Sequence, residues 1–261
     1  MAMRLKSWLD QTLRQRAQME WARLSHAVPK LGSARLRYLR DEAGALRRDI
    51  DRFLLRSDRR VALSQAELSR IPLPGGTDWR WRPEVLSARI APTGMAAPEG
   101  GLRLGDSVAI WHDCEQRALI LRQTQNAEAT DLAAFGLRLE ALGFTGNFLS
   151  LAIDLPASAR EELTRNHIVR VETTLQVERD MEVYARLNIG NGPNTEELVQ
   201  HLGTLRGGAS HARVIEFDLA MTEMNENRLD KIWMDLIFEK PLMNAVTIRE
   251  MIVSRHPRAN V

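Results

Sequence analysis

Polar side chains alternate with apolar ones through residues 167–190, HIVRVETTLQVERDMEVYARLNIG. Alternate residues of an extended strand point to the same face, so the segment predicts a β-hairpin with one buried and one exposed face. With a tight turn near residues 179–180, we expect Gln176 to lie across from Tyr184 and Thr174 across from Arg186. The candidate ligand-binding residues on the exposed face are Glu172, Thr174, Gln176, Tyr184, Arg186 and Asn188.

This combination of side chains is suited to binding a sugar. An aromatic ring supplies area for stacking, and guanidinium and amide groups give direction to hydrogen bonds with hydroxyl groups. A glycan is therefore the ligand that the exposed face favours. The same alternation is also typical of a solvated sheet face with cross-strand charge pairs, and that alternative stays open.

His112, Asp113 and Cys114 are adjacent residues of types that bind transition metals. Neighbouring side chains on a strand point in different directions, and no second pair of ligands is spaced to complete a tetrahedral site. We therefore predict no metal site and expect Cys114 to be a small core residue. Because the chain has one cysteine, it cannot form an internal disulfide.

Signatures of catalysis are absent from the sequence. It contains no phosphate-binding loop, dinucleotide-binding turn, zinc-protease helix or serine nucleophile elbow, so no catalytic residue and no cofactor are assigned. A glycosidase needs only two carboxylates brought together in space, and 34 acidic residues offer many such pairs. The sequence favours a non-catalytic protein and leaves a glycan hydrolase with an unrecognised carboxylate pair as an alternative.

From residue 79 onward, the sequence pattern is typical of a β protein. Short apolar runs recur at regular spacing between Gly, Pro, Asn and Asp residues, which predicts an antiparallel sandwich or barrel. Near the C-terminus, WMDLIFE and AVTIREMIV are separated by residues 240–244, so we expect the second run to lie beside the first. The first run is apolar on nearly both faces and is predicted to lie in the middle of a sheet.

The segment WMDLIFEKPLMNAVTIREMIVSR resembles the closing strands of galactose-binding-like jelly-roll sandwiches, the fold of many carbohydrate-binding modules. Together with MEVYARLNIGNGPNTE and GNFLSLAIDLP, it also resembles a family of uncharacterised alphaproteobacterial proteins over most of residues 79–258. The first resemblance implies a jelly-roll fold, and the second implies no established activity. Function stays open, because one fold hosts many functions.

Residues 1–60 are predicted to be helical. Apolar residues recur at steps of three and four on both sides of a break at residues 29–33. After the break, one set follows the spacing of a heptad seam: Leu36, Leu39, Ala43, Leu46, Ile50 and Phe53. This seam is shorter than the about three to four heptads typical of a coiled coil, so the pattern favours a helical hairpin that packs on the body or on a partner.

The sequence divides into three parts. Residues 71–76, IPLPGG, mark a connector, so we predict a basic helical arm at 1–60, a connector at 61–78 and a jelly-roll-like antiparallel β-sandwich at 79–261. Residues 1–60 carry 15 Lys and Arg against 7 Asp and Glu, whereas the rest of the chain carries 21 against 27. The arm is therefore basic and the body acidic.

The arm is the second candidate binding surface. Its candidate partner-binding residues combine apolar and basic side chains: Leu46, Arg47, Arg48, Ile50, Arg52, Phe53 and Arg56. A protein partner or self-association fits this combination. Nucleic acid and an anionic membrane surface are less favoured, since no reading helix, zinc finger or aromatic RNA motif accompanies the basic residues and acids are interspersed among them.

The start of the chain, MAMRLKSWLDQTLRQ, breaks its apolar positions with charges and so lacks the apolar region of a signal peptide. No segment approaches the about 20 apolar residues of a membrane-spanning helix, so we expect a cytoplasmic protein. The sequence predicts a non-catalytic protein whose sandwich binds a glycan or a partner surface. The alternative is a structural or assembly subunit of a particle or envelope complex that makes its contact through the arm.

Overall fold

The computed structural model describes residues 2–65, 71–128 and 131–258, and the side chains of residues 13, 15–53, 71–128 and 131–258. The chain divides into two compact units, Met1–Leu54 and Leu55–Val261. Helices make up the first unit. A β-sandwich makes up most of the second unit.

The described part of the N-terminal region, residues 2–65, forms two long helices, as the apolar spacing predicted. α1 (Ala2–Ala27) leads into the 3-10 turn η1 (Val28–Lys30), and α2 (Ser33–Gln65) begins directly after Gly32. The predicted break is confirmed, because η1 contains Pro29, which has no backbone N–H to continue the helical hydrogen bonds. α2 continues through Gln65 into the segment that was predicted as connector.

Thirteen strands form the sandwich within the residues that the structure describes. They are β1 (Trp79–Trp81), β2 (Gly94–Ala96), β3 (Arg103–Leu104), β4 (Val108–His112), β5 (Leu119–Gln125), β6 (Phe135–Leu142), β7 (Leu149–Asp154), β8 (His167–Val177), β9 (Met181–Asn191), β10 (Asn194–Leu205), β11 (Ser210–Asp218), β12 (Leu229–Phe238) and β13 (Met243–Pro257). Short helices occupy some connections: α3 (Glu84–Ser87), η3 (Ala157–Ala159), η4 (Leu219–Met221) and η5 (Glu226–Arg228).

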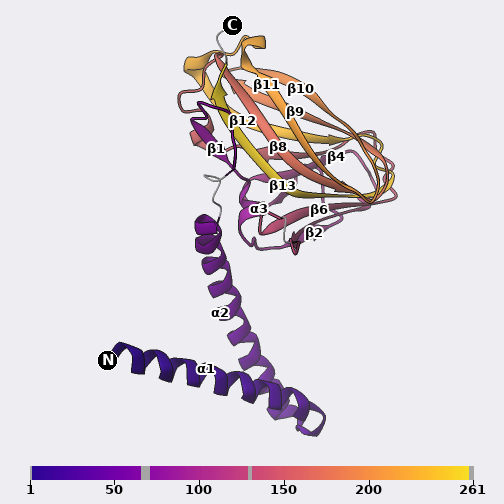
Figure 1. The fold of residues 1–261 in the computed structure, drawn as a ribbon. Helices are drawn as coiled ribbons and strands as arrows, with labels where there is room; N and C mark the ends of the chain where they lie inside the picture. The colour runs from indigo at the N-terminus through magenta and orange to yellow at the C-terminus, as the bar shows by residue number, and fades with distance from the viewer. Residues whose placement is uncertain (1, 66–70, 129–130, 259–261) are drawn as a thin grey trace. The chain divides into compact units, whose positions relative to one another are not determined.

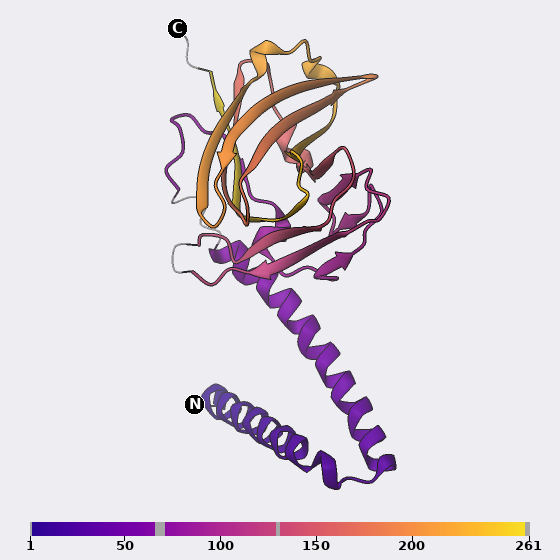
Figure 2. The same ribbon diagram turned by 90° about the vertical axis from the view of Figure 1, so that its right-hand side faces the viewer.

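The strands pair into two antiparallel sheets, which confirms the predicted jelly-roll-like sandwich, preceded in the sequence by helices. The seven-stranded sheet has the order β11-β8-β13-β6-β5-β2, with β1 paired to β13, and the six-stranded sheet has the order β10-β9-β12-β7-β4-β3. From β6 onward, every connection except β9 to β10 passes from one sheet to the other, as in a jelly roll. The long strands curve across the sandwich in both views (Figure 1, Figure 2).

The predicted hairpin over residues 167–190 is wrong. β8 pairs with β11 and β13 in one sheet, whereas β9 pairs with β10 and β12 in the other. β12 and β13 are likewise in different sheets and do not lie side by side as expected. Apolar alternation fixes which face of a strand is buried, and that face is the same whether the next strand lies beside it or across the core.

The burial of alternate residues agrees with the prediction. Val171 and Leu175 of β8 and Leu187 of β9 are fully buried between the sheets. β12 lies between β9 and β7, which confirms its predicted central position, and its Leu236 also points into the core. The opposite residues of these strands face away from the core and form the outer faces of the two sheets, where Asn188 and Asp235 are covered by their neighbours.

Candidate functional site

The outward face of the six-stranded sheet brings polar and aromatic residues of several strands together. Strand register aligns these residues in cross-strand rows that lie about 6.6 Å apart, because every second residue of a strand shares a face. The middle row is Val199, Arg186, Asp235, Ala152 and Ala109, and the rows on its two sides are Tyr184, Ile237, Ser150 and Trp111, and Asn188, Trp233 and Asp154.

A hollow of about 550 Å³ lies over these rows, and we call it the cleft. Its lining residues are Arg103, Ala109, Trp111, Phe148, Ser150, Ala152, Asp154, Arg186, Lys231, Trp233, Asp235 and Ile237. Small side chains at Ala109 and Ala152 leave space between the larger residues around them. Trp111 and Phe148 border this space with 49% and 48% of their surfaces exposed.

One end of the cleft carries a carboxylate between two cations. Arg103 Nη2 lies 2.7 Å from Asp154 Oδ2, and Lys231 Nζ lies 2.9 Å from Asp154 Oδ1. The same ammonium group is 5.3 Å from the ring centroid of Trp233, within the range of a cation–π contact. These contacts place an aromatic ring and several donors beside one another.

The middle of the cleft is bordered by a hydrogen-bonded network. Arg186 donates to Asp235 Oδ2 from Nε at 3.1 Å and from Nη2 at 2.8 Å, and Asn188 Nδ2 donates to the same oxygen at 3.0 Å. Burial opposes the charge on Arg186, but the hydrogen bonds and negative charge of Asp235 raise the pKa of Arg186 above its ordinary value. The guanidinium therefore stays charged and fixed in orientation.

Tyr184 lies beyond this network, toward the edge strand β10. Its ring stacks on His201, with centroids 4.6 Å apart and an interplanar angle of 24°. His201 Nε2 is 2.5 Å from Glu182 Oε2, and Thr204 donates to the other oxygen of the same carboxylate. The hydrogen bond from Thr204, followed by that from His201, lowers the pKa of Glu182. One face of the Tyr184 ring is thus covered by another residue.

Asp113 fixes the segment that carries Phe148. Its Oδ1 accepts hydrogen bonds from the backbone N–H of Asn147 at 2.7 Å and of Phe148 at 3.1 Å, and its Oδ2 accepts from Asn147 Nδ2 at 2.7 Å. These bonds, led by the one from the Asn147 side chain, lower the pKa of Asp113. The hydrogen bond from the Phe148 backbone to Asp113 therefore holds this residue at the border of the cleft.

The neighbours of Asp113 contact each other through the backbone, because the N–H of Cys114 donates to His112 Nδ1 at 3.2 Å. His112 Nε2 is 3.0 Å from the carbonyl oxygen of Pro98, and Cys114 is a buried core residue, as predicted. Burial raises the pKa of Cys114, but hydrogen bonds from Thr145 and from nearby backbone amides lower it to about 7. Among the described residues, no group of three or more His, Cys, Asp or Glu side chains is arranged to hold a metal ion.

The predicted ligand-binding residues do not form one surface. Arg186 lines the cleft, and Tyr184 and Asn188 share its sheet, but Asn188 is fully buried, contrary to its expected exposure. Glu172, Thr174 and Gln176 lie on β8 in the seven-stranded sheet, because the chain changes sheets after Val177.

Most residues of the cleft were not predicted from the sequence. Trp111, Phe148 and Trp233 come from three separate segments that only the sheet order brings together. A signal was present in WMDLIFE, where Asp235 shares a strand face with Trp233 and Ile237. A charged residue between two large apolar residues on one face indicates a surface rather than a core.

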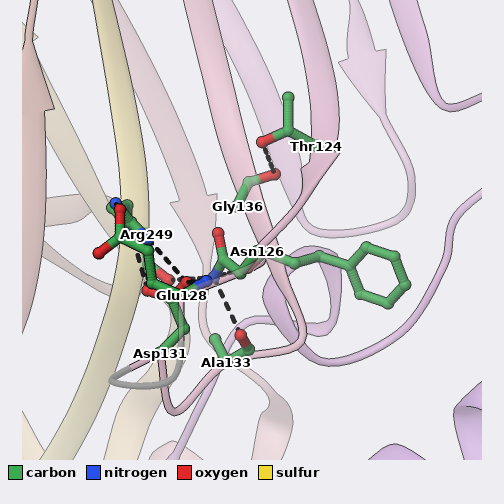
Figure 3. A network of polar contacts seen from close by, with 8 residues as sticks. Thr124, Asn126, Glu128, Asp131, Ala133, Gly136 and Arg249 are labelled. Atoms are coloured by element: carbon green, nitrogen blue, oxygen red, sulfur yellow. Dashed lines mark hydrogen bonds and ion pairs between the residues drawn. The ribbon is translucent and has the colours of Figure 1, made fainter.

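A second polar cluster lies on the seven-stranded sheet and has a structural role (Figure 3). Arg249 Nη2 contacts both carboxylate oxygens of Asp131, at 2.8 and 2.7 Å, and Nη1 pairs with Glu128. Asn126 Nδ2 donates to the carbonyl oxygens of Ala133, Phe135 and Arg249 at 2.9, 3.1 and 3.0 Å. These bonds join the connection between β5 and β6 to β13.

The candidate partner-binding residues of the arm are on α2. The side chains of Leu46, Ile50 and Phe53 are 40%, 49% and 68% exposed. Arg47 lies 3.6 Å from Asp51, Arg52 lies 3.4 Å from Asp49, and Arg48 is exposed. The side chain of Arg56 lies outside those that the structure describes. Within the described residues, neither α1 nor α2 has the length of apolar sequence that a bilayer-crossing helix requires.

Comparison with solved structures finds proteins of low sequence identity. The CBM22-1 xylan-binding domain of Paenibacillus barcinonensis Xyn10C is 9% identical, with 64% of this chain and 94% of that chain covered and a TM-score of 0.39. The family 11 carbohydrate-binding module of Clostridium thermocellum is 9% identical, with 59% and 92% covered and a TM-score of 0.38. Tailspike protein 4 of bacteriophage CBA120 is 3% identical, with 60% and 21% covered and a TM-score of 0.42.

Comparison with curated protein sequences finds no match. A family model matches the sequence along its entire length, at residues 1–261, so the match includes the helices as well as the sandwich that carries the cleft. The chain therefore belongs to this family, which is described as a family of unknown function, DUF6478.

Proposed function

We propose that the chain is a non-catalytic glycan-binding protein and that the cleft is its binding site. The observation that carries this proposal is the exposure of Trp111 and Phe148 beside a hollow floored by small side chains. Large aromatic surfaces left in contact with water mark binding sites, and the face of a sugar ring covers them with C–H groups. Ala109 and Ala152 provide the room that the ring needs.

The polar residues of the cleft match the other requirement of a sugar, which is directional hydrogen bonding to hydroxyl groups. Arg103, Lys231 and Arg186 are charged donors held in place by carboxylates. Three donor groups converge on Asp235 Oδ2, so Oδ1 is the oxygen that we assign to a ligand hydroxyl. Such charge-assisted hydrogen bonds are short and sensitive to geometry, and they select among sugars by the direction of their hydroxyls.

The ion pairs made by the carboxylates of the cleft favour binding over hydrolysis. Asp154 lies in ion pairs with Arg103 and Lys231, and Asp235 is paired with Arg186. A glycosidase needs one carboxyl group that protonates the leaving oxygen and a second that acts as nucleophile or base. The carboxylates of the cleft are instead engaged in holding donors. Of the residues predicted from the sequence, Arg186 contacts the ligand, Asn188 orients Asp235, and Tyr184 extends the surface toward β10.

A glycan array probed with the full chain tests this proposal. We expect binding by the unmodified chain and its loss in the double variant Trp111→Ala/Phe148→Ala. Tyr38→Ala, which removes an exposed aromatic residue of α2, is the matched control and should bind normally. Binding that persists in the double variant would contradict the assignment of the site. Shortened products after incubation with a bound oligosaccharide would support the hydrolase alternative instead.

A further inference from the structure

The second helix carries an apolar seam that faces solvent within the described part of the chain. Its members follow spacings of three and four residues: Leu36, Leu39, Ala43, Leu46, Ile50 and Phe53. Leu36, Leu46, Ile50 and Phe53 are 36%, 40%, 49% and 68% exposed, and Leu39 and Ala43 are half-buried. These residues occupy the a and d positions of a heptad that extends about 27 Å along the helix.

We propose that this seam, although shorter than the about three to four heptads of a typical coiled coil, binds the same seam of a second copy of the chain, in parallel, as a short two-stranded coiled coil. Ile50 at an a position, with Leu39 and Leu46 at d positions, is the combination that favours two strands in a parallel arrangement. None of the seam residues belongs to the sandwich, so the dimer is independent of the glycan-binding cleft.

The charges beside the seam distinguish a parallel from an antiparallel pair. In a parallel pair, each g residue faces the e residue five positions later in its partner, which places Glu42 opposite Arg47 of the other copy. Both side chains are exposed, with 84% of the Arg47 side chain accessible. This contact occurs twice in the dimer because of its two-fold symmetry.

The antiparallel arrangement that matches the whole seam puts like charges together. There, Leu36 faces Phe53, and the flanking contacts become Glu42 with Asp49 and Arg40 with Arg47. Both contacts are repulsive, and each occurs twice. The parallel arrangement has one kind of repulsive contact, Arg35 with Arg40 in the first two turns of α2, and it also occurs twice. The attractive Glu42 contact therefore decides in favour of the parallel pair.

A second copy fits this surface better than an anionic lipid or nucleic acid does. Glu42 and Asp49 stand beside the apolar seam among Arg35, Arg40 and Arg47, so the flanking charges are mixed and do not form the continuous basic surface that an anionic lipid or nucleic acid requires. Arg47 of a second copy instead attracts Glu42. The apolar residues and their flanking charges thus select the same partner.

Sedimentation velocity of the full chain over about 1 to 100 μM tests the proposal, a range that detects micromolar association. We expect a concentration-dependent dimer that Ile50→Asp abolishes. Glu42→Lys should weaken the dimer by about tenfold, because two attractive contacts become repulsive, and the added change Arg47→Glu should restore it. The matched control is Asp41→Lys, which makes the same charge change at the outward f position and should leave the dimer unchanged.

Three results would overturn the proposal. A monomer at every concentration would show that the seam does not bind a second copy. A dimer that survives Ile50→Asp would place the contact elsewhere on the chain. A dimer that Glu42→Lys strengthens would show the antiparallel arrangement, in which this substitution relieves the repulsion with Asp49.

Oxidation of Leu36→Cys gives a second readout, because only the parallel arrangement brings the two introduced thiols together.

Discussion

Arg186 on β9 and Asp235 on β12 form an ion pair between neighbouring strands, with 2.8 Å between Nη2 and Oδ2, beside the small residues of the cleft. The Asp235 side chain is 5% exposed, whereas that of Arg186 is 35% exposed. Removing either residue should therefore have a different effect. Removing Arg186 leaves a buried carboxylate without its cation, whereas removing Asp235 leaves a guanidinium that still donates to Glu197 at 3.3 Å.

This asymmetry predicts that Arg186→Ala costs more stability than Asp235→Ala. We expect Arg186→Ala to lower the free energy of unfolding by roughly 3 to 5 kcal/mol, the range for an uncompensated buried charge. Urea denaturation measures the change. Arg117→Ala, which breaks the exposed ion pair with Glu99, is the control and should cost at most about 1 kcal/mol. An equal or larger loss for Asp235→Ala would contradict this account of the pair.

Gly146 is predicted to be essential to the position of Phe148. A Cβ at residue 146 would lie 2.8 Å from the backbone nitrogen of Cys114 and would clash with Asp113, whose carboxylate holds the Phe148 backbone. We expect Gly146→Ala to destabilise the fold by about 1 to 3 kcal/mol through overpacking and to weaken ligand binding. Gly75→Ala is the control, since a Cβ there meets open space. Unchanged stability and binding in Gly146→Ala would refute the close packing.

The pKa of Asp113 predicts how this segment responds to acid. Because its folded-state pKa is lowered, its contribution to stability is complete above the ordinary aspartate value of about 3.9 and is lost as the pH falls through the lower folded value. NMR titration of the carboxyl carbon should give a midpoint below about 3.9, with the Asn147 amide proton shifting in parallel. In Asp113→Asn, the amide should no longer respond. A midpoint above the ordinary value would contradict the observed hydrogen bonds.

Much of the fold follows from local sequence pattern. Alternation through residues 167–190 identified the buried faces of both strands, and the apolar run that contains Leu236 identified a central strand. Pairing could not be predicted in the same way, since Gln176 and Tyr184 have the same alternation whether they share a sheet or lie in opposite sheets. Their separation depends on the order of the complete sheets, which is set by contacts between distant segments.

The cleft was harder to predict than the fold for a related reason. Trp111 and Trp233 are far apart in the sequence, and Trp111 reaches the same surface only because β4 and β12 both pair with β7. Arg186 was identified because the alternation of polar and apolar residues within its own strand places it on the outward face. Its ion pair with the buried Asp235 could not be predicted, because the partner belongs to a different segment.

The most direct test of glycan binding in the cleft is calorimetric titration of the full chain with an oligosaccharide selected by array, with Trp111→Ala compared to Tyr38→Ala. Trp111 is 49% exposed, so its truncation should leave the melting temperature nearly unchanged while weakening binding by at least about tenfold, a loss of about 1.4 kcal/mol of binding free energy. Tyr38→Ala should bind as the unmodified chain does. Equal affinity in Trp111→Ala and Tyr38→Ala, with both variants folded, would contradict the assignment of the cleft as the glycan site.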